Sequence, residues 1–141
     1  MASSIMDRRD TSDNRSHRSL QLALAAAQAA EDNRGQDVVV LDMRELTPIF
    51  DYFVIATGTS RKQLHAMSEE IDHCLEDELG DHRGGIEGYD ASSWILLDYG
   101  SVVVHLFDRP TREYYSLEQL WAGAERVARP EPAPPPRISP K

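Results

Sequence analysis

The fold is decided by one stretch, residues 52–80, which reads YFVIATGTSRKQLHAMSEEIDHCLEDELG. It opens with Tyr52–Ala56, a short apolar run that predicts a strand. Gly58-Thr59-Ser60 then predicts a turn into a helix, with Thr59 or Ser60 as its N-cap. Gly80 stands where a C-terminal cap belongs. The helix is amphipathic, because its apolar residues recur every three or four positions, at Leu64, Met67, Ile71, Leu75 and Leu79.

The sequence before this stretch predicts one more helix and one more strand. The helix is expected to run from an N-cap at Ser19 to a stop at Gly35. The run Val38–Leu41 is apolar throughout and lies between two aspartates, which is typical of a strand buried on both faces. A break follows at Thr47-Pro48. One face of the predicted helix is formed by Leu20, Leu24 and Ala27.

After the stretch the chain predicts three strands. Gly85–Glu87 is a weak run that is expected at or near an edge of the sheet. Trp94–Asp98 and Val102–Phe107 are strong runs. Only Tyr99-Gly100-Ser101 separates them, so they are predicted to form a hairpin with a tight turn.

The end of the domain is predicted to be helical. Thr111 is expected to cap a short turn, and Ser116 with Gln119 has the pattern of a capping box for a last helix that ends near Val127. The elements then follow the order helix–strand–strand–helix–strand–strand–strand–helix. This order predicts a single α/β domain with a mixed five-stranded sheet and flanking helices.

Both ends of the chain differ in composition from this domain. Residues 1–18 are polar, lack apolar periodicity and carry four arginines against three aspartates, so they are predicted to be disordered. Residues 129–141 contain six of the eight prolines and are predicted to form an extended tail without packed structure. The domain is therefore expected to span residues 19–128.

The negative charge of the chain is concentrated in this domain. All 141 residues together have a net charge of −9, whereas residues 19–128 hold 8 basic and 20 acidic residues, a net charge of −12. Binding to nucleic-acid phosphates requires clustered lysine and arginine, so direct nucleic-acid binding is not expected. Complementary charge favours a basic protein surface as the partner. Acidity that serves solubility alone is the alternative.

Two further classes of protein conflict with the composition. No apolar run approaches the roughly 18–20 residues that a membrane-spanning helix needs, so a transmembrane protein is not expected. The one cysteine, Cys74, cannot form a disulfide within the chain. A reducing compartment, the cytoplasm, is therefore predicted.

The sequence contains no strong metal-binding or nucleophilic pattern. His65 and His73 are eight residues apart on the predicted helix, too far for ligands one helical turn apart. Cys74 borders the apolar stripe of that helix and has the setting of a small core residue rather than of a nucleophile. We expect neither a metal nor a cofactor.

The turn Gly58-Thr59-Ser60 raises one enzymatic alternative. A turn of this kind between a strand and a helix can bind phosphate, as in nucleotidyltransferases. Their chemistry also needs two Mg²⁺-binding carboxylates close together on a strand, and Glu87 and Asp98 each lack a partner at that spacing. We therefore predict that the protein is not an enzyme, with a nucleotidyltransferase-like or nucleotide-binding protein as the alternative.

The predicted hairpin carries the most unusual side chains. Trp94, Leu96 and Asp98 alternate onto one face of their strand, and Tyr99 stands at the turn. With Glu87 beside them they would form an apolar patch with acidic neighbours, the composition of a protein-interface hot spot. If helices cover only the opposite face of the sheet, Trp94 faces outward as an anchor. The alternative is that Trp94 is a core residue.

Four segments in series resemble the ribosomal silencing factor (Iojap) family. They are Asp51–Ser60, Gly85–Gly88, the hairpin from Trp94 to His105, and Arg112–Trp121. The likeness runs from about Leu20 to about Val127, which is nearly the whole predicted domain.

The resemblance implies a fold related to nucleotidyltransferases without their catalytic carboxylates. It also implies a cytoplasmic protein that binds ribosomal protein fourteen on the large subunit, blocks joining of the small subunit, and represses translation under nutrient stress. Whether the protein forms a homodimer is left open by the resemblance. Ser101 departs from the pattern, because many members carry an acidic residue there. Carried over by motif, the partner-binding residues would be Glu87, Trp94, Leu96, Asp98, Tyr99, Tyr115 and Trp121. For Tyr115 and Trp121 the alternative is that they pack the last helix.

Overall fold

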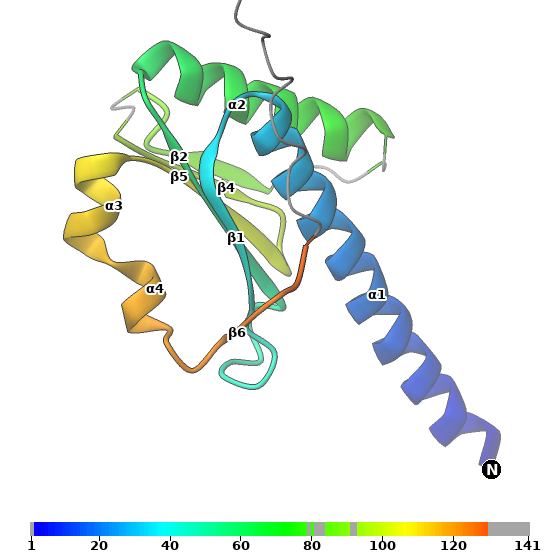
Figure 1. Ribbon diagram of the computed structural model, residues 1–141. Helices are drawn as coiled ribbons and strands as arrows, with labels where there is room; N and C mark the ends of the chain where they lie inside the picture. The colour runs from blue at the N-terminus through cyan, green and yellow to red at the C-terminus, as the bar shows by residue number, and fades with distance from the viewer. Residues whose placement is uncertain (1, 79, 81–83, 91–92, 130–141) are drawn as a thin grey trace, which may run out of the picture.

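The computed structural model describes residues 2–78, 80, 84–90 and 93–129, with side chains from residue 14 onward except that of Glu78 (Figure 1). Its elements follow one another as α1 (Ala2–Asp32), β1 (Gln36–Asp42), β2 (Tyr52–Gly58), α2 (Arg61–His73), the π-helical turn η1 (Cys74–Glu78), β3 (Gly85–Glu87), β4 (Trp94–Asp98), β5 (Val102–Asp108), α3 (Arg109–Tyr115), α4 (Leu117–Leu120) and β6 (Glu125–Arg126).

The strands form one mixed sheet in the order β3-β4-β5-β2-β1-β6. At its centre β2 and β5 run parallel, in register from Tyr52 opposite Val102 to Gly58 opposite Asp108. The other neighbouring pairs in this sheet are antiparallel. The predicted mixed α/β sheet is confirmed, but it has six strands instead of five, because β6 pairs with β1 where a helix was predicted.

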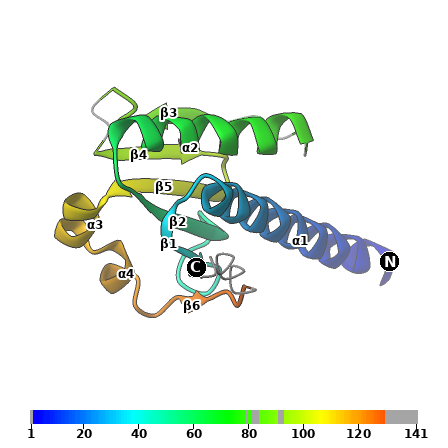
Figure 2. The same cartoon turned by 45° about the horizontal axis from the view of Figure 1, so that its top comes forward.

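The helices α1 and α2 lie on one face of the sheet and form the larger core with it (Figures 1 and 2). Alternate residues of β2, β4 and β5 point into this core, and α2 contributes the predicted stripe. Leu79, the last predicted residue of that stripe, lies outside the described residues. The fully buried side chains from the stripe are Leu64, Met67, Ile71 and Leu75.

The turn into α2 is a structural helix start. Ser60 is the N-cap, and its side chain accepts a hydrogen bond from the backbone N–H of Gln63 at 3.1 Å. A Cβ added to Gly58 would lie 2.7 Å from Cδ2 of Leu64. Gly58 therefore allows β2 to pack closely against α2, which explains a glycine at this position without a bound phosphate.

Helix α1 is longer than predicted and buries a wider face than predicted. It begins at Ala2, so the segment predicted to be disordered continues the helix. Once the packed part of a helix has formed, further turns add one hydrogen bond per residue fixed, which permits such an extension. Ser19 is not an N-cap but a buried residue whose hydroxyl pairs with that of Ser101 at 2.7 Å. Of the predicted face, Ala27 is buried, Leu20 is half-buried against the core, and Leu24 is half-buried. The other buried apolar residues of α1 are Leu22, Ala23, Ala26, Ala29 and Ala30.

The opposite face of the sheet has an apolar cluster of its own. Its buried members are Leu41, Met43, Phe53, Ile55, Val103 and Phe107, and residues of the α4 segment pack against them. Figure 1 shows α3 and α4 on the side of the sheet away from α1. The condition for a fully outward Trp94, that helices cover only the opposite face, is therefore not met. We call this side the second face.

The C-terminal segment is less helical than predicted. Asp108, not Thr111, caps α3, since its carboxylate accepts from the Thr111 N–H at 2.9 Å. Ser116 has a left-handed backbone with φ 47°. Its hydroxyl donates to the carbonyl of Glu113 at 2.6 Å and does not cap α4. The predicted capping box is therefore wrong, and the helix stops at Leu120 instead of continuing to Val127.

The edge of the sheet at β1 and the C-terminal end of the domain also differ from expectation. Strand β1 is only partly buried, since its outer neighbour β6 has just two residues. Arg129, predicted to begin a tail, forms an ion pair with Glu31 of α1. The N–H of Val127 donates to the carbonyl of Val40 at 2.8 Å. The remainder of the predicted tail, residues 130–141, lies outside the described residues.

Candidate functional site

Part of the second face stays accessible at the β3–β4 end of the sheet. On β5 and β2 the side chains of this face are buried, whereas Trp94, Leu96 and Asp98 of β4 are half-buried and Glu87 of β3 is exposed. Glu87 lies directly opposite Leu96 in the antiparallel pairing. We name these four residues the open face.

Trp94 lies at the border between the open face and the buried cluster. Its indole is 4.9 Å from the Phe107 ring and 4.8 Å from the Tyr115 ring, measured between centroids. Its Nε1–H donates to Nδ1 of His105 at 3.2 Å. Trp94 is therefore neither a fully buried core residue nor a freely outward one, because it packs between Phe107 of the sheet and Tyr115 of α3 and stays half-buried.

Aromatic rings continue from Trp94 in both directions across the second face. On one side Tyr115 contacts Tyr114 at 5.0 Å, and these rings are 51% and 81% exposed. On the other side His105 contacts Phe53 at 4.8 Å, and Phe53 contacts Trp121 at 6.2 Å. Tyr115 and Trp121 therefore lie on the same face of the sheet as Trp94, and Trp121 also packs against the buried cluster there. Such aromatic groups bordered by charge favour a protein-binding function.

The two acidic residues of the open face have different surroundings. Glu87 is exposed on the edge strand β3. Asp98 is half-buried, and its carboxylate accepts the N–H of Gly100 at 2.8 Å, which holds the turn between β4 and β5. Gly100 has φ 85°, a left-handed backbone that glycine adopts without strain. Glu87 is thus the more accessible carboxylate for a partner.

Tyr99 does not join the open face. It is buried in the core on the α1–α2 side of the sheet, where its hydroxyl donates to Asp72 of α2 at 2.8 Å. The position of Tyr99 in a turn gave no signal of this burial. Its role in the structure is to fasten the β4–β5 hairpin to α2.

A glycine after β3 fixes where β4 begins. Gly88 has φ 77°, and a Cβ added to it would lie 1.9 Å from the carbonyl oxygen of Trp94. Any other residue at position 88 would therefore displace the backbone of Trp94. This contact gives a physical reason for the glycine in the segment Gly85–Gly88 and ties that segment to the open face.

His105 is a feature of the site that sequence reasoning missed. It lies on β5 opposite Leu96, is 5% exposed, and receives the Trp94 hydrogen bond. Burial lowers the pKa of the imidazole from 6.5 to about 4. The alternation of β5 could have placed His105 on the face of Trp94, because Leu96 and His105 pair directly across the two strands.

Arg112 is a second feature that was missed. It is 8% exposed, and its guanidinium donates to Thr57 of β2 at 2.7 Å and to Glu118 of α4 at 2.8 Å. Glu118 also accepts from Arg126 of β6 at 3.3 Å. This chain of contacts fastens the C-terminal segment onto the sheet, and thereby holds Tyr115 beside Trp94.

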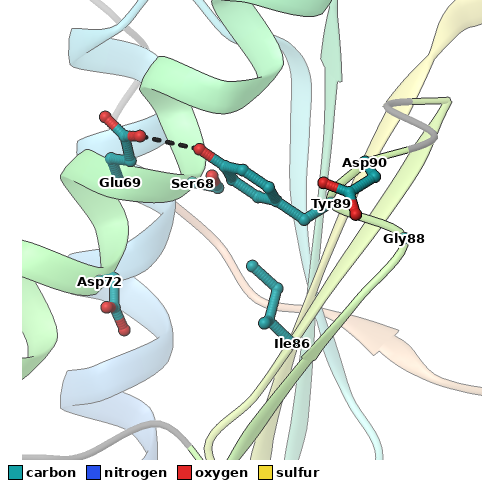
Figure 3. Close-up of a pocket in the computed structure, with 7 residues that line it drawn as sticks. All are labelled: Ser68, Glu69, Asp72, Ile86, Gly88, Tyr89 and Asp90. Carbon is teal, nitrogen blue, oxygen red and sulfur yellow. Dashed lines mark hydrogen bonds between the residues drawn. The ribbon is translucent and has the colours of Figure 1, made fainter.

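A separate hollow of about 650 Å³ lies between α2 and the connection from β3 to β4 (Figure 3). The hydroxyl of Tyr89 donates to Glu69 at 2.8 Å, and the Tyr89 ring stacks on His65 with centroids 4.1 Å apart. These contacts attach the connection to α2. With Asp72 and Asp90 also in its lining, the hollow has the wrong charge for a nucleotide phosphate.

The turn before α2 offers no stronger case for nucleotide binding. The N–H and hydroxyl of Thr59 both donate to Oε1 of Gln63, at 2.6 and 2.7 Å. Donors that a phosphate would need are therefore already bonded within the protein. In the described part of the chain, no three His, Cys, Asp or Glu side chains gather as a metal site would require.

The fold defines a small α/β domain, and the composition of the open face favours a protein-binding function over catalysis. Comparison with known proteins gives a family for it, because the family model described as "Ribosomal silencing factor during starvation" matches residues 16–140. The chain belongs to this family, which consists of translation regulators and not of enzymes.

Individual relatives agree with the family model. The chain is 43% identical over 99 residues to "Ribosomal silencing factor RsfS" of Bacillus subtilis, an alignment that covers 70% of this chain and 83% of the relative. It is 35% identical over 112 residues to "Protein Iojap, chloroplastic" of Arabidopsis thaliana, covering 79% of this chain and 46% of that protein.

The fold is similar to a solved structure as well. A crystal structure of a Chromobacterium violaceum protein superposes with a TM-score of 0.70 at 34% sequence identity, covering 82% of this chain and 92% of the other. Within the described residues, no helix has both the length and the apolar character required to span a membrane.

Proposed function

We propose that this protein binds the large ribosomal subunit through its ribosomal protein fourteen. Bound there, it would prevent the small subunit from joining and so repress translation when nutrients are short. The contact would be made by the open face, flanked by Tyr115 and Trp121. The compartment would be the cytoplasm, where bacterial subunits join.

The observation that carries this proposal is the open face itself. Trp94 and Leu96 are held on a strand of the sheet and are only half-buried, and Glu87 beside them is exposed. An apolar pair, Trp94 and Leu96, with the carboxylates of Glu87 and Asp98 beside it fits a protein surface that is apolar at its centre and basic at its border. Ribosomal proteins contact RNA phosphates, so basic surfaces are common among them.

The charge of the whole domain supports the same partner. Residues 19–128 carry a net charge of −12, which would repel free RNA and attract a basic protein. Such a protein acts by occupying a surface, so its effect should be stoichiometric and should not involve turnover of a substrate.

The test is co-sedimentation of the purified protein with isolated large subunits. Glu87→Lys reverses the charge of an exposed residue on the open face. Glu70→Lys makes the same change at an exposed residue of α2, on the opposite side of the sheet. We expect Glu87→Lys to weaken binding at least about fivefold and Glu70→Lys to have little effect, because like charges at an interface rim slow association.

Subunit joining supplies the second readout. Prior binding of the protein should reduce the yield of joined ribosomes in proportion to the fraction of large subunits occupied. The proposal fails if the two lysine variants bind equally well, or if the protein binds naked ribosomal RNA as tightly as it binds subunits. It also fails if bound protein leaves joining unchanged.

A further inference from the structure

The indole of Trp94 has limited apolar support. Phe107 packs on it from the sheet, and Tyr115, which is itself 51% exposed, borders it on the other side. A half-buried side chain at the border of a cluster can adopt more than one rotamer unless a directional contact selects one. The hydrogen bond from Nε1–H to Nδ1 of His105 is such a contact.

The strand register places His105 next to both apolar residues of the open face. In the antiparallel pair of β4 and β5, Leu96 lies directly opposite His105 and Trp94 lies opposite Phe107. His105 is therefore the direct neighbour of Leu96 and the diagonal neighbour of Trp94 on one face. Its position below the open face is set by the backbone of the sheet and not by a loop.

The hydrogen bond also defines the protonation state of His105. Indole nitrogen can only donate, so Nδ1 must be unprotonated and the ring proton must be on Nε2. Burial keeps the imidazole neutral at neutral pH, because its pKa is lowered to about 4. His105 thus presents a permanent acceptor to Trp94 under the conditions in which ribosomes work.

Stability alone does not explain a histidine at this place. Its Nε2 atom is buried and has no hydrogen-bond partner among the described residues. The imidazole also meets the Phe53 ring edge to face, with centroids 4.8 Å apart and an interplanar angle of 70°, so an apolar ring and not an acceptor is its close neighbour there. A buried donor without a partner destabilises the folded state, and an apolar side chain of similar size would avoid this.

We propose that His105 is a positioning residue that holds the Trp94 indole in the orientation required for binding. This inference rests on the proposed function, in which Trp94 is an anchor of the contact with the partner. Holding the ring in place before binding removes part of the entropy that would otherwise be lost when the complex forms.

The test compares two substitutions of the histidine. His105→Leu removes the acceptor and keeps an apolar side chain of similar bulk, whereas His105→Asn keeps an acceptor oxygen near the position of Nδ1. We expect His105→Leu to bind large subunits about five- to tenfold more weakly, the range of one hydrogen bond, and His105→Asn to recover part of this loss. His105→Leu should unfold at the same or a higher temperature than the unmodified protein.

Two further readouts separate positioning from a general structural role. In a nitrogen–proton NMR spectrum, the indole resonance that Trp94→Phe deletes should shift in His105→Leu and exchange faster with solvent. In the Trp94→Phe background, which lacks the donor, His105→Leu should cause no further loss of binding.

The outcomes distinguish this inference from the proposed function. Unmodified protein that does not bind subunits would contradict the proposed function, and the indole resonance would still test the hydrogen bond. Subunit binding by His105→Leu at full strength would overturn the inference, as would an unchanged Trp94 resonance. If His105→Leu does not fold, the test rests on His105→Asn, which keeps an acceptor for the indole. Subunit binding by His105→Asn as weak as that by Trp94→Phe, which lacks the donor, would then overturn the inference.

Discussion

At the scale of single residues, Trp94 packs within the domain and in the proposed function also anchors the partner, two roles that the sequence presented as alternatives. Its ring packs against Phe107 and Tyr115, yet the residue stays half-buried at the open face. Trp94→Ala would therefore lose packing within the domain as well as contact with a partner. Charge reversal at exposed Glu87 is the cleaner test of the surface, because Glu87 supports no packing in the core.

The buried imidazole of His105 predicts a dependence of stability on pH. In the folded protein its pKa is about 4, against 6.5 for the free side chain, so below pH 6.5 the unfolded chain binds a proton that the folded chain does not. The contribution of neutral His105 to the free energy of unfolding is fully present above pH 6.5 and is lost as the pH falls toward 4. At pH 4.5 we expect the loss to be about 2 kcal/mol.

Urea unfolding at pH 7 and pH 4.5 measures this effect, with His105→Leu as the control. Carboxylates titrate in both proteins, so the difference between the two pH dependences isolates the histidine. The unmodified protein should lose more stability on acidification than the leucine variant. Equal losses would show that His105 is solvated or protonated in the folded state.

At the scale of elements, the sequence predicted β2, α2, β3, β4 and β5 well, because each has a local signal. Ser60 caps α2 as predicted, and the alternation of β4 separates Trp94 and Leu96 from the core residues Ile95 and Leu97. The open face was predictable for the same reason. Alternation along a strand fixes which side chains share a face whatever the rest of the fold does.

The C-terminal segment could not be predicted in this way, because contacts distant in sequence determine it. The left-handed Ser116 and the pairing of β6 with β1 override a local helix pattern. Tyr99 was misplaced because its burial depends on Asp72 of α2. His105 was missed because its hydrogen bond comes from Trp94 on the neighbouring strand, and Arg112 because its burial depends on Thr57 of the distant strand β2.

Arg112 should control the attachment of the C-terminal segment to the sheet. Arg112→Met leaves the hydroxyl of Thr57 and the carboxylate of Glu118 without their main partner. We expect a loss of about 2–3 kcal/mol in the free energy of unfolding. Arg109→Met is the matched control on the same helix, because Arg109 and its partner Asp37 are exposed and such pairs contribute at most about 1 kcal/mol.

Urea unfolding of the two variants provides the comparison. Equal losses for Arg112→Met and Arg109→Met would contradict the assigned role, since burial of the pair would then not matter. The aromatic contact of Tyr115 with Trp94 should loosen only in Arg112→Met, and weaker subunit binding by that variant is expected to follow.

At the scale of the whole molecule, charge and structure are divided unevenly along the chain. The packed domain is strongly acidic, whereas residues 1–18 carry a net charge of +1. In Figure 1 the first turns of α1 extend beyond the sheet. Among the side chains described, the first buried one in α1 is Ser19. The packing of the domain, including its open face, therefore involves α1 from Ser19 onward.

A chain of residues 19–129 is accordingly expected to fold and to bind large subunits as tightly as the full chain. Removing one residue more, to leave 19–128, deletes Arg129 and leaves the largely buried carboxylate of Glu31 without that ion pair. Loss of about 1 kcal/mol in a domain of this size lowers Tm by roughly 4–8 °C. Calorimetry and co-sedimentation of both shortened chains test this expectation. Early melting of 19–129 would show that the first half of α1 stabilises the domain, and equal Tm values would show that the Arg129 contact contributes nothing.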